Sequence, residues 1–146
     1  MTARSFMTFA THVVARADDQ GRDMPPPGKE LASALAQGLE RCGFTITEQV
    51  GEHGSYGWYF VVRTAAGKRV WCMLQQSDQW LLITEPLLPL LHRLLHRFFR
   101  SAEYARAHRQ VCQALDAAAR EHEGVSGIQW FSRQDFEAQQ PGVERP

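Results

Sequence analysis

The sequence predicts a single α+β domain in two layers, with a mainly antiparallel sheet and helices packed on one face of it. Four strand-like segments follow one another between residues 44 and 84, separated by turns of only three to five residues. Connections this short allow only hairpins, so these strands form an antiparallel meander. Helical periodicity precedes and follows the meander, as is typical of an α+β domain. The expected order along the chain is β-α-β-β-β-β-α-α-β.

The first two elements are a strand and a helix. Residues 6–15 alternate in character, with Met7 and Phe9 on the same side of the predicted strand. From Lys29 the apolar spacing becomes helical, and Gly43 stands where a left-handed C-terminal cap belongs. The helix carries an apolar stripe of Leu31, Leu35, Leu39 and Cys42.

The meander supplies the next four strands, which we expect at residues 44–50, 56–64, 69–76 and 80–84. In the first of these, Phe44, Ile46 and Val50 alternate with polar residues, which predicts one face in solvent. Residues 56–62 are apolar on both sides. Such a segment is expected to be a central strand, covered on both faces by the protein or by a partner.

Two helices are predicted after the meander. Thr84, Glu85 and Pro86 are expected to open the first of them, because proline is well tolerated in a first helical turn. Ser101 is the expected N-cap of the next helix, which ends near His122.

The C-terminal part begins with a short strand at 126–131, and Ser132 with Asp135 resembles a capping box for one final helical turn. The remaining residues have little apolar content. We therefore expect one domain over residues 1–137 and a flexible tail at 138–146.

Length and charge exclude several classes of protein. The chain of 146 residues is 44% hydrophobic, which is enough for one core without disulfides or a structural metal. Sixteen basic residues balance sixteen acidic ones, so no net positive charge attracts nucleic acid. No apolar run reaches the roughly 20 residues that a membrane-spanning helix needs. We expect neither nucleic acid nor a membrane as a partner.

Cysteine usage and residue bias indicate the setting. The three cysteines are scattered and do not form a disulfide framework, so we expect small buried hydrophobes in a reducing cytoplasm. Arginine outnumbers lysine by fourteen to two, as in a bacterial protein from a GC-rich genome. Nucleotide-binding glycine motifs and the common hydrolase motifs are absent, so we predict no catalytic residues and no cofactor.

The second predicted helix divides into an apolar half and a basic half. Its apolar half is wider than one stripe requires, so the helix is expected to be sandwiched in the fold, to meet a partner or a second copy, or to lie on a membrane surface. Residues 92 to 109 contain five arginines and only one carboxylate, and this excess of positive charge favours an acidic protein surface as partner. The basic face comprises His92, Arg93, His96, Arg97 and Arg100.

A metal site on this helix is not expected. His92 and His96 have the spacing that two-histidine metal sites use. However, no third ligand lies nearby in the sequence, and the adjacent arginines would repel a divalent cation.

A second candidate surface is aromatic. Tyr56, Trp58 and Tyr59 occur in one predicted strand, and Trp71 and Trp80 in the next two. This cluster is either core or, where no helix covers the sheet, a surface for a partner.

His108 lies within the apolar stripe of the last long helix, one turn before Cys112. A catalytic pair of these two residues would face the core, with no orienting carboxylate or amide in evidence. His108 is therefore expected to be a hydrogen-bonded core residue.

These observations favour a small, non-catalytic cytoplasmic module that binds another protein with an acidic surface, or binds a second copy of itself as a homodimer. Inhibitors, immunity proteins, chaperones and regulatory adaptors fit this description. The alternative is a small-molecule-binding protein or hydrolase with an aromatic-lined pocket between sheet and helices, using His108 or His12.

Overall fold

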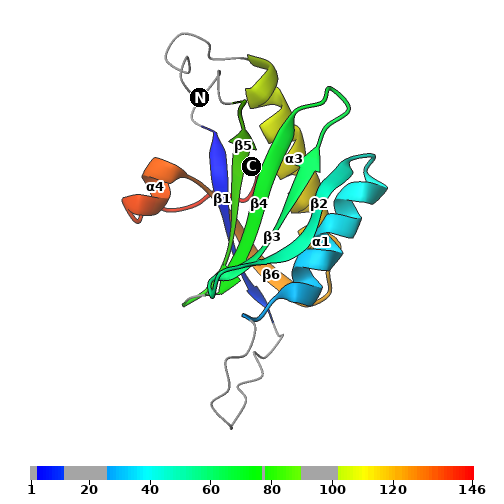
Figure 1. Ribbon diagram of the computed structural model, residues 1–146. Helices are drawn as coiled ribbons and strands as arrows, with labels where there is room; N and C mark the ends of the chain where they lie inside the picture. The colour runs from blue at the N-terminus through cyan, green and yellow to red at the C-terminus, as the bar shows by residue number, and fades with distance from the viewer. Residues whose placement is uncertain (1–2, 12–25, 77, 90–101) are drawn as a thin grey trace.

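The computed structural model describes residues 3–11, 26–76, 78–89 and 102–146. These residues form one sheet, two long helices and one short helix (Figure 1). The elements are β1 (Arg4–Thr11), α1 (Lys29–Arg41), β2 (Thr45–His53), β3 (Gly57–Arg63), β4 (Arg69–Gln76), β5 (Trp80–Leu87), α3 (Ala102–Glu121), β6 (Val125–Ser132) and α4 (Arg133–Glu137).

The six strands form one sheet in the order β2-β3-β4-β5-β1-β6, and each neighbouring pair is antiparallel. The predicted meander occupies β2 to β5, and the α+β class with an antiparallel sheet is confirmed. Strand β1 inserts between β5 and β6, so the first and last strands in the sequence lie side by side at one edge of the sheet.

Helices α1 and α3 contact each other and cover one face of the sheet (Figure 1). Leu31, Leu35 and Leu39 of the predicted stripe are buried there, while Cys42 caps the helix and is exposed, contrary to our expectation. Gly43 follows with a φ of 92°, as the predicted cap requires. The sheet contributes alternate residues to this core, among them Met7, Phe9, Trp58, Phe60, Val62, Val70, Cys72, Leu74, Leu82 and Trp130.

The predicted helix start at Thr84–Pro86 is wrong, because β5 continues as a strand to Leu87. Glu85, Pro86 and Leu87 pair with Trp71, Val70 and Arg69 of β4. The register of β5 with β1 ends at Ile83, so Pro86 lies on a local edge of the sheet. A proline without an N–H group is tolerated at such an edge. Residues 90–101, which hold the rest of the predicted helix, lie outside the described residues.

The short helix α4 contacts β1 and β6. The expected cap at Ser132 is present, because Ser132 Oγ accepts a hydrogen bond of 3.1 Å from the Asp135 N–H. The Asp135 carboxylate accepts a hydrogen bond of 2.7 Å from the Ser132 hydroxyl and not from its backbone N–H, so the arrangement is an N-cap and not a full capping box. Phe136 stacks on Phe6 with ring centroids 5.0 Å apart. Since Phe6 alternates with the core residue Met7, α4 lies on the sheet face opposite α1 and α3.

The C-terminal segment predicted to be a flexible tail forms several contacts with the fold. The Val143 N–H and C=O exchange two backbone hydrogen bonds with Trp130, at 2.9 and 2.7 Å. The Arg4 guanidinium donates a hydrogen bond of 2.9 Å to the carbonyl of Arg145. The segment thereby lies along β6 and reaches the start of β1.

Candidate functional site

The residues predicted to bind a partner fall into two groups. His92, Arg93, His96, Arg97 and Arg100 lie outside the described residues, so the structure does not place the predicted basic face.

The three predicted aromatic residues are described, and the structure separates them. Trp58 is 7% exposed in the core on the helix side, where its indole N–H donates a hydrogen bond of 2.7 Å to the Pro26 carbonyl. Tyr56, in the β2–β3 turn, is 69% exposed. Tyr59 lies on the face of β3 opposite Trp58. The three side chains therefore do not form one surface, and Tyr59 belongs to a different set of neighbours.

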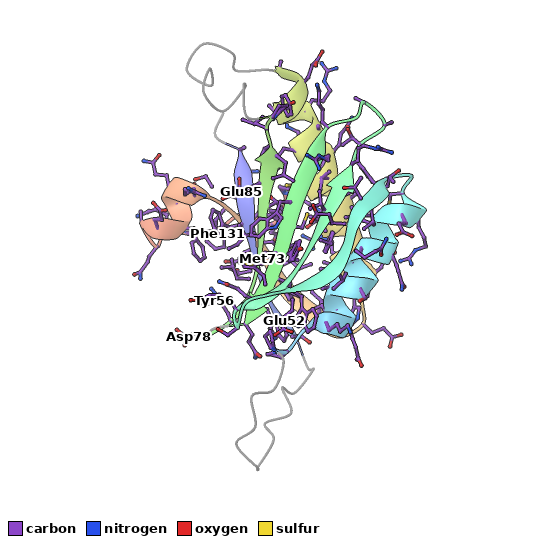
Figure 2. All side chains as sticks on the ribbon, in the orientation of Figure 1. Glu52, Tyr56, Met73, Asp78, Glu85 and Phe131 are labelled. Atoms are coloured by element: carbon purple, nitrogen blue, oxygen red, sulfur yellow. The ribbon has the colours of Figure 1, made fainter. Side chains whose placement is uncertain are left out.

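Those neighbours form a row of large apolar side chains across the sheet. Tyr59 pairs with Met73, Met73 with Ile83, and Ile83 with Phe6. Phe6 in turn pairs with Phe131. Figure 2 shows Met73 and Phe131 on the side of the sheet that faces away from α1 and α3. The row thus runs without a break from β3 to β6 on the face that the two long helices leave uncovered.

A second row lies next to the first, where Val61 pairs with Trp71 and Trp71 with Glu85. The His53 ring meets both Tyr59 and Trp71 edge-on, at centroid distances of 5.8 and 5.6 Å. Aromatic edge contacts of this kind hold the rings in a fixed arrangement. We call the surface formed by Tyr59, Val61, Trp71, Met73, Leu81 and Ile83 the open face.

Only one end of this side of the sheet is covered by a helix in the described part of the chain. Phe136 of α4 packs on Phe6 and Phe131, and the contacts of α4 fall on β1 and β6. On the open face Tyr59, Trp71 and Ile83 are partly exposed, whereas Val61, Met73 and Leu81 are buried between them. Large apolar side chains in this state on a sheet surface are typical of a contact site.

Charged residues border the open face unevenly. Arg63 and Arg69 are directly opposite each other on β3 and β4, and both side chains are exposed. Neither forms an ion pair with a described residue. Glu85 is already paired with Arg133 of α4 at 2.6 Å. Two like charges at opposed positions destabilise a sheet, so this arrangement has a cost that a partner carboxylate would remove.

A buried polar cluster lies on the other side of the sheet. His108 Nε2 of α3 is 2.8 Å from Oγ1 of Thr84 and 3.5 Å from Sγ of Cys112. The Thr84 hydroxyl is also 3.1 Å from the Ser5 carbonyl and 3.4 Å from the Cys112 sulfur. His108 is therefore a hydrogen-bonded core residue, as predicted from its place in the stripe. The sequence did not indicate Thr84 as its partner, because 24 residues separate the two.

The electrostatics of this cluster do not favour nucleophilic catalysis. Burial raises the pKa of Cys112 to about 12, although the hydrogen bond with Thr84 opposes the shift. Burial also lowers the pKa of His108. Both groups are therefore neutral near pH 7, whereas nucleophilic cysteine chemistry needs the thiolate. The pair can exchange hydrogen bonds but does not form an activated nucleophile.

No group of three or more histidine, cysteine or acidic side chains in the described residues could hold a metal ion. None of the described helices combines the length and apolar character needed to cross a bilayer.

Comparisons of the chain with protein-family models, with curated proteins and with solved structures found no match.

Proposed function

We propose that this chain is a non-catalytic protein-binding module and that the open face is its contact surface. The observation that carries the proposal is the continuous row from Tyr59 through Met73 and Ile83 to Phe6 on a face that α1 and α3 do not cover. Tyr59 and Ile83 in this row are partly exposed, whereas Met73 and Phe6 are buried. Aromatic and methionine side chains are enriched in protein contact surfaces, because they bury a large area at a small entropy cost.

The charges at the border of this face support an acidic class of partner. Arg63 and Arg69 are a pair of neighbouring guanidinium groups with no carboxylate partner among the described residues. A partner that places a carboxylate over them gains charge-assisted hydrogen bonds and relieves the repulsion between them. The proposed partner is therefore a protein that presents an apolar patch flanked by acidic residues.

A second copy of the chain fits these charges less well. On this side of the sheet Glu85 is already paired with Arg133, so among the described residues of β2 to β5 it is Glu48 of β2 that is left to meet two arginines. A foreign acidic surface can satisfy both. The predicted homodimer is accordingly an alternative outcome of the test. The basic face predicted between residues 92 and 100 would suit the same acidic class of partner.

The test compares three forms of the chain in a capture experiment followed by titration. Three forms are immobilised: the wild type, the Arg63→Glu/Arg69→Glu variant and the control Arg41→Glu/Arg106→Glu. The proteins that each form captures are then identified. Each captured protein is then purified and titrated against the three forms. Arg41 and Arg106 are exposed on the helix side and form no ion pair with a described residue, so the control has the same charge change.

We expect the open-face variant to weaken binding at least about tenfold, while the control stays within about twofold, because only contacting charges determine the dissociation rate strongly. Tyr59→Ala should weaken binding as well. Equal binding by all three forms would contradict the proposal. Sedimentation of the purified chain gives the other arm: a dimer that Tyr59→Ala dissociates would show that a second copy occupies the face.

A further inference from the structure

A cavity of about 270 Å³ lies between the start of β1 and the first half of α3, on the side of the sheet opposite the open face. It is distinct from the surface of the proposed function and is tested separately. Its walls are formed by Ala3, Arg4, Ala105, His108, Arg109, Cys112 and Pro146.

The side chains that line this cavity include two arginines and no acidic residue. Arg4 from β1 and Arg109 from α3 approach it from opposite elements, and no lining residue is acidic. Arg4 donates one hydrogen bond to the Arg145 carbonyl, which holds its guanidinium in place. Neither arginine has an ion-pair partner in the described ranges. Two guanidinium groups at one concave site favour an anion with several oxygen atoms.

The inner wall is polar but uncharged. His108 and Cys112 are 3% and 1% exposed, and each is held by Thr84 through the contacts described above. Because burial keeps the imidazole and the thiol neutral, neither repels an anion, and neither supplies a nucleophile.

From this geometry we infer that the cavity between β1 and α3 binds a small oxyanion, a phosphate or a compact carboxylate, through the guanidinium groups of Arg4 and Arg109. The volume of about 270 Å³ is large enough for such an anion together with its hydration water.

The experiment is a calorimetric titration of the whole chain with inorganic phosphate at constant ionic strength, with succinate as a second arm. We expect saturable binding with a Kd of about 1 mM, the order reachable by a ligand of a few non-hydrogen atoms. The tighter of the two ligands assigns the anion to the phosphate or the carboxylate class. Amide shifts in residues 105–112 on ligand addition would place the bound anion at the cavity.

Two variants and one control decide the assignment. Arg109→Gln should weaken binding at least tenfold, whereas Arg106→Gln, one turn earlier on α3 and outside the cavity, should leave the Kd within twofold of the wild type. Ala105→Phe fills the cavity with both arginines retained and should also abolish binding. Circular dichroism melting checks that each variant is folded, and Arg109 is exposed, so its replacement spares the core. No saturable binding of either anion up to about 50 mM, or equal effects of Arg106→Gln and Arg109→Gln, would overturn the inference.

Discussion

The indole N–H of Trp130 donates a hydrogen bond of 3.0 Å to Oδ1 of Asp116, which joins strand β6 to helix α3 through a carboxylate whose side chain is only 3% exposed. The other oxygen, Oδ2, accepts hydrogen bonds of 2.9 Å from Arg120 Nε and from Arg145. Arg120 also donates a hydrogen bond to the Glu144 carbonyl. One buried carboxylate thus ties a strand, a helix and the C-terminal segment together.

Replacing this carboxylate should destabilise the protein. We expect Asp116→Ala to lower the free energy of unfolding by about 2–3 kcal/mol, because the Trp130 N–H is left buried without an acceptor. Asp116→Asn should lower the free energy of unfolding by less, since the amide oxygen can still accept a hydrogen bond from the Trp130 N–H. Urea denaturation measures both. Glu121→Ala, an exposed acidic position on the same helix, is the control and should change stability little.

The same carboxylate predicts a pH dependence. Burial by itself raises the pKa of Asp116, but the hydrogen bonds from Arg120, Trp130 and Arg145 outweigh it and hold the pKa below its ordinary value of 3.8. A lowered folded-state pKa gives a contribution that is complete above the unfolded-state pKa and is lost as pH falls through the folded-state pKa.

The difference in unfolding free energy between wild type and Asp116→Asn should therefore be constant from neutral pH to about pH 5 and shrink below about pH 4. Urea denaturation at several pH values measures it. A difference that stays constant down to about pH 2 would show that the charge of Asp116 contributes nothing.

The three thiols should differ in reactivity. Cys42 is exposed, whereas Cys72 and Cys112 are buried, and burial raises the pKa of both. With a pKa of about 12, Cys112 is a thiolate in a fraction on the order of 10⁻⁴ at pH 8. A thiol reagent should therefore modify one cysteine per chain in the native protein and all three after denaturation. Cys42→Ser should abolish the rapid phase, and a rapid phase that persists would contradict the burial of the other two.

The arginine pair beside the open face predicts a gain in stability on mutation. Arg63→Glu turns a like-charge pair with Arg69 into an opposite-charge pair, and such cross-strand pairs contribute about 0.2–1 kcal/mol. We expect the melting temperature to rise slightly while affinity for an acidic partner falls. A higher melting temperature together with a lower affinity would indicate that Arg63 has a binding role. If Arg63 had a structural role, its replacement would lower the stability of the protein.

A close approach between the two long helices can be tested by adding one methyl group. A Cβ placed on Gly38 of α1 would lie 2.6 Å from Cβ of Ala118 on α3. Gly38→Ala should therefore destabilise the protein by about 1 kcal/mol, even though alanine favours a helix over glycine. The double variant Gly38→Ala/Ala118→Gly should recover part of this loss. Additive effects in thermal unfolding would show that the two positions do not touch.

The local elements of this fold could largely be predicted from periodicity. Strand β4 has the predicted bounds, and α1, α3 and the Ser132 cap lie where their stripes and capping residues indicate. The end of β5 could not be predicted in this way, because Pro86 is compatible with both a first helical turn and a sheet edge. Its pairing with Val70 decided between them.

The candidate surfaces were less accessible to prediction. Tyr59 was identified as an aromatic residue of a double-sided strand, but its neighbours Met73 and Ile83 come from strands that only the sheet register brings beside it. Trp58 had the same aromatic signal and lies in the core. Alternation along one strand assigns residues to two faces, but it does not say which face the helices cover.

The sequence by itself determined the α+β class, the antiparallel meander and the helical stripes, because these depend on residues close together in the chain. The tertiary structure decided that β1 lies between β5 and β6, that Thr84 meets His108, and that Asp116 receives both Trp130 and Arg145. These contacts join segments that are far apart in the sequence, and packing and hydrogen bonding in the folded chain bring them together. No local pattern carries that information, since nothing near each residue in the sequence indicates which distant residue it will contact.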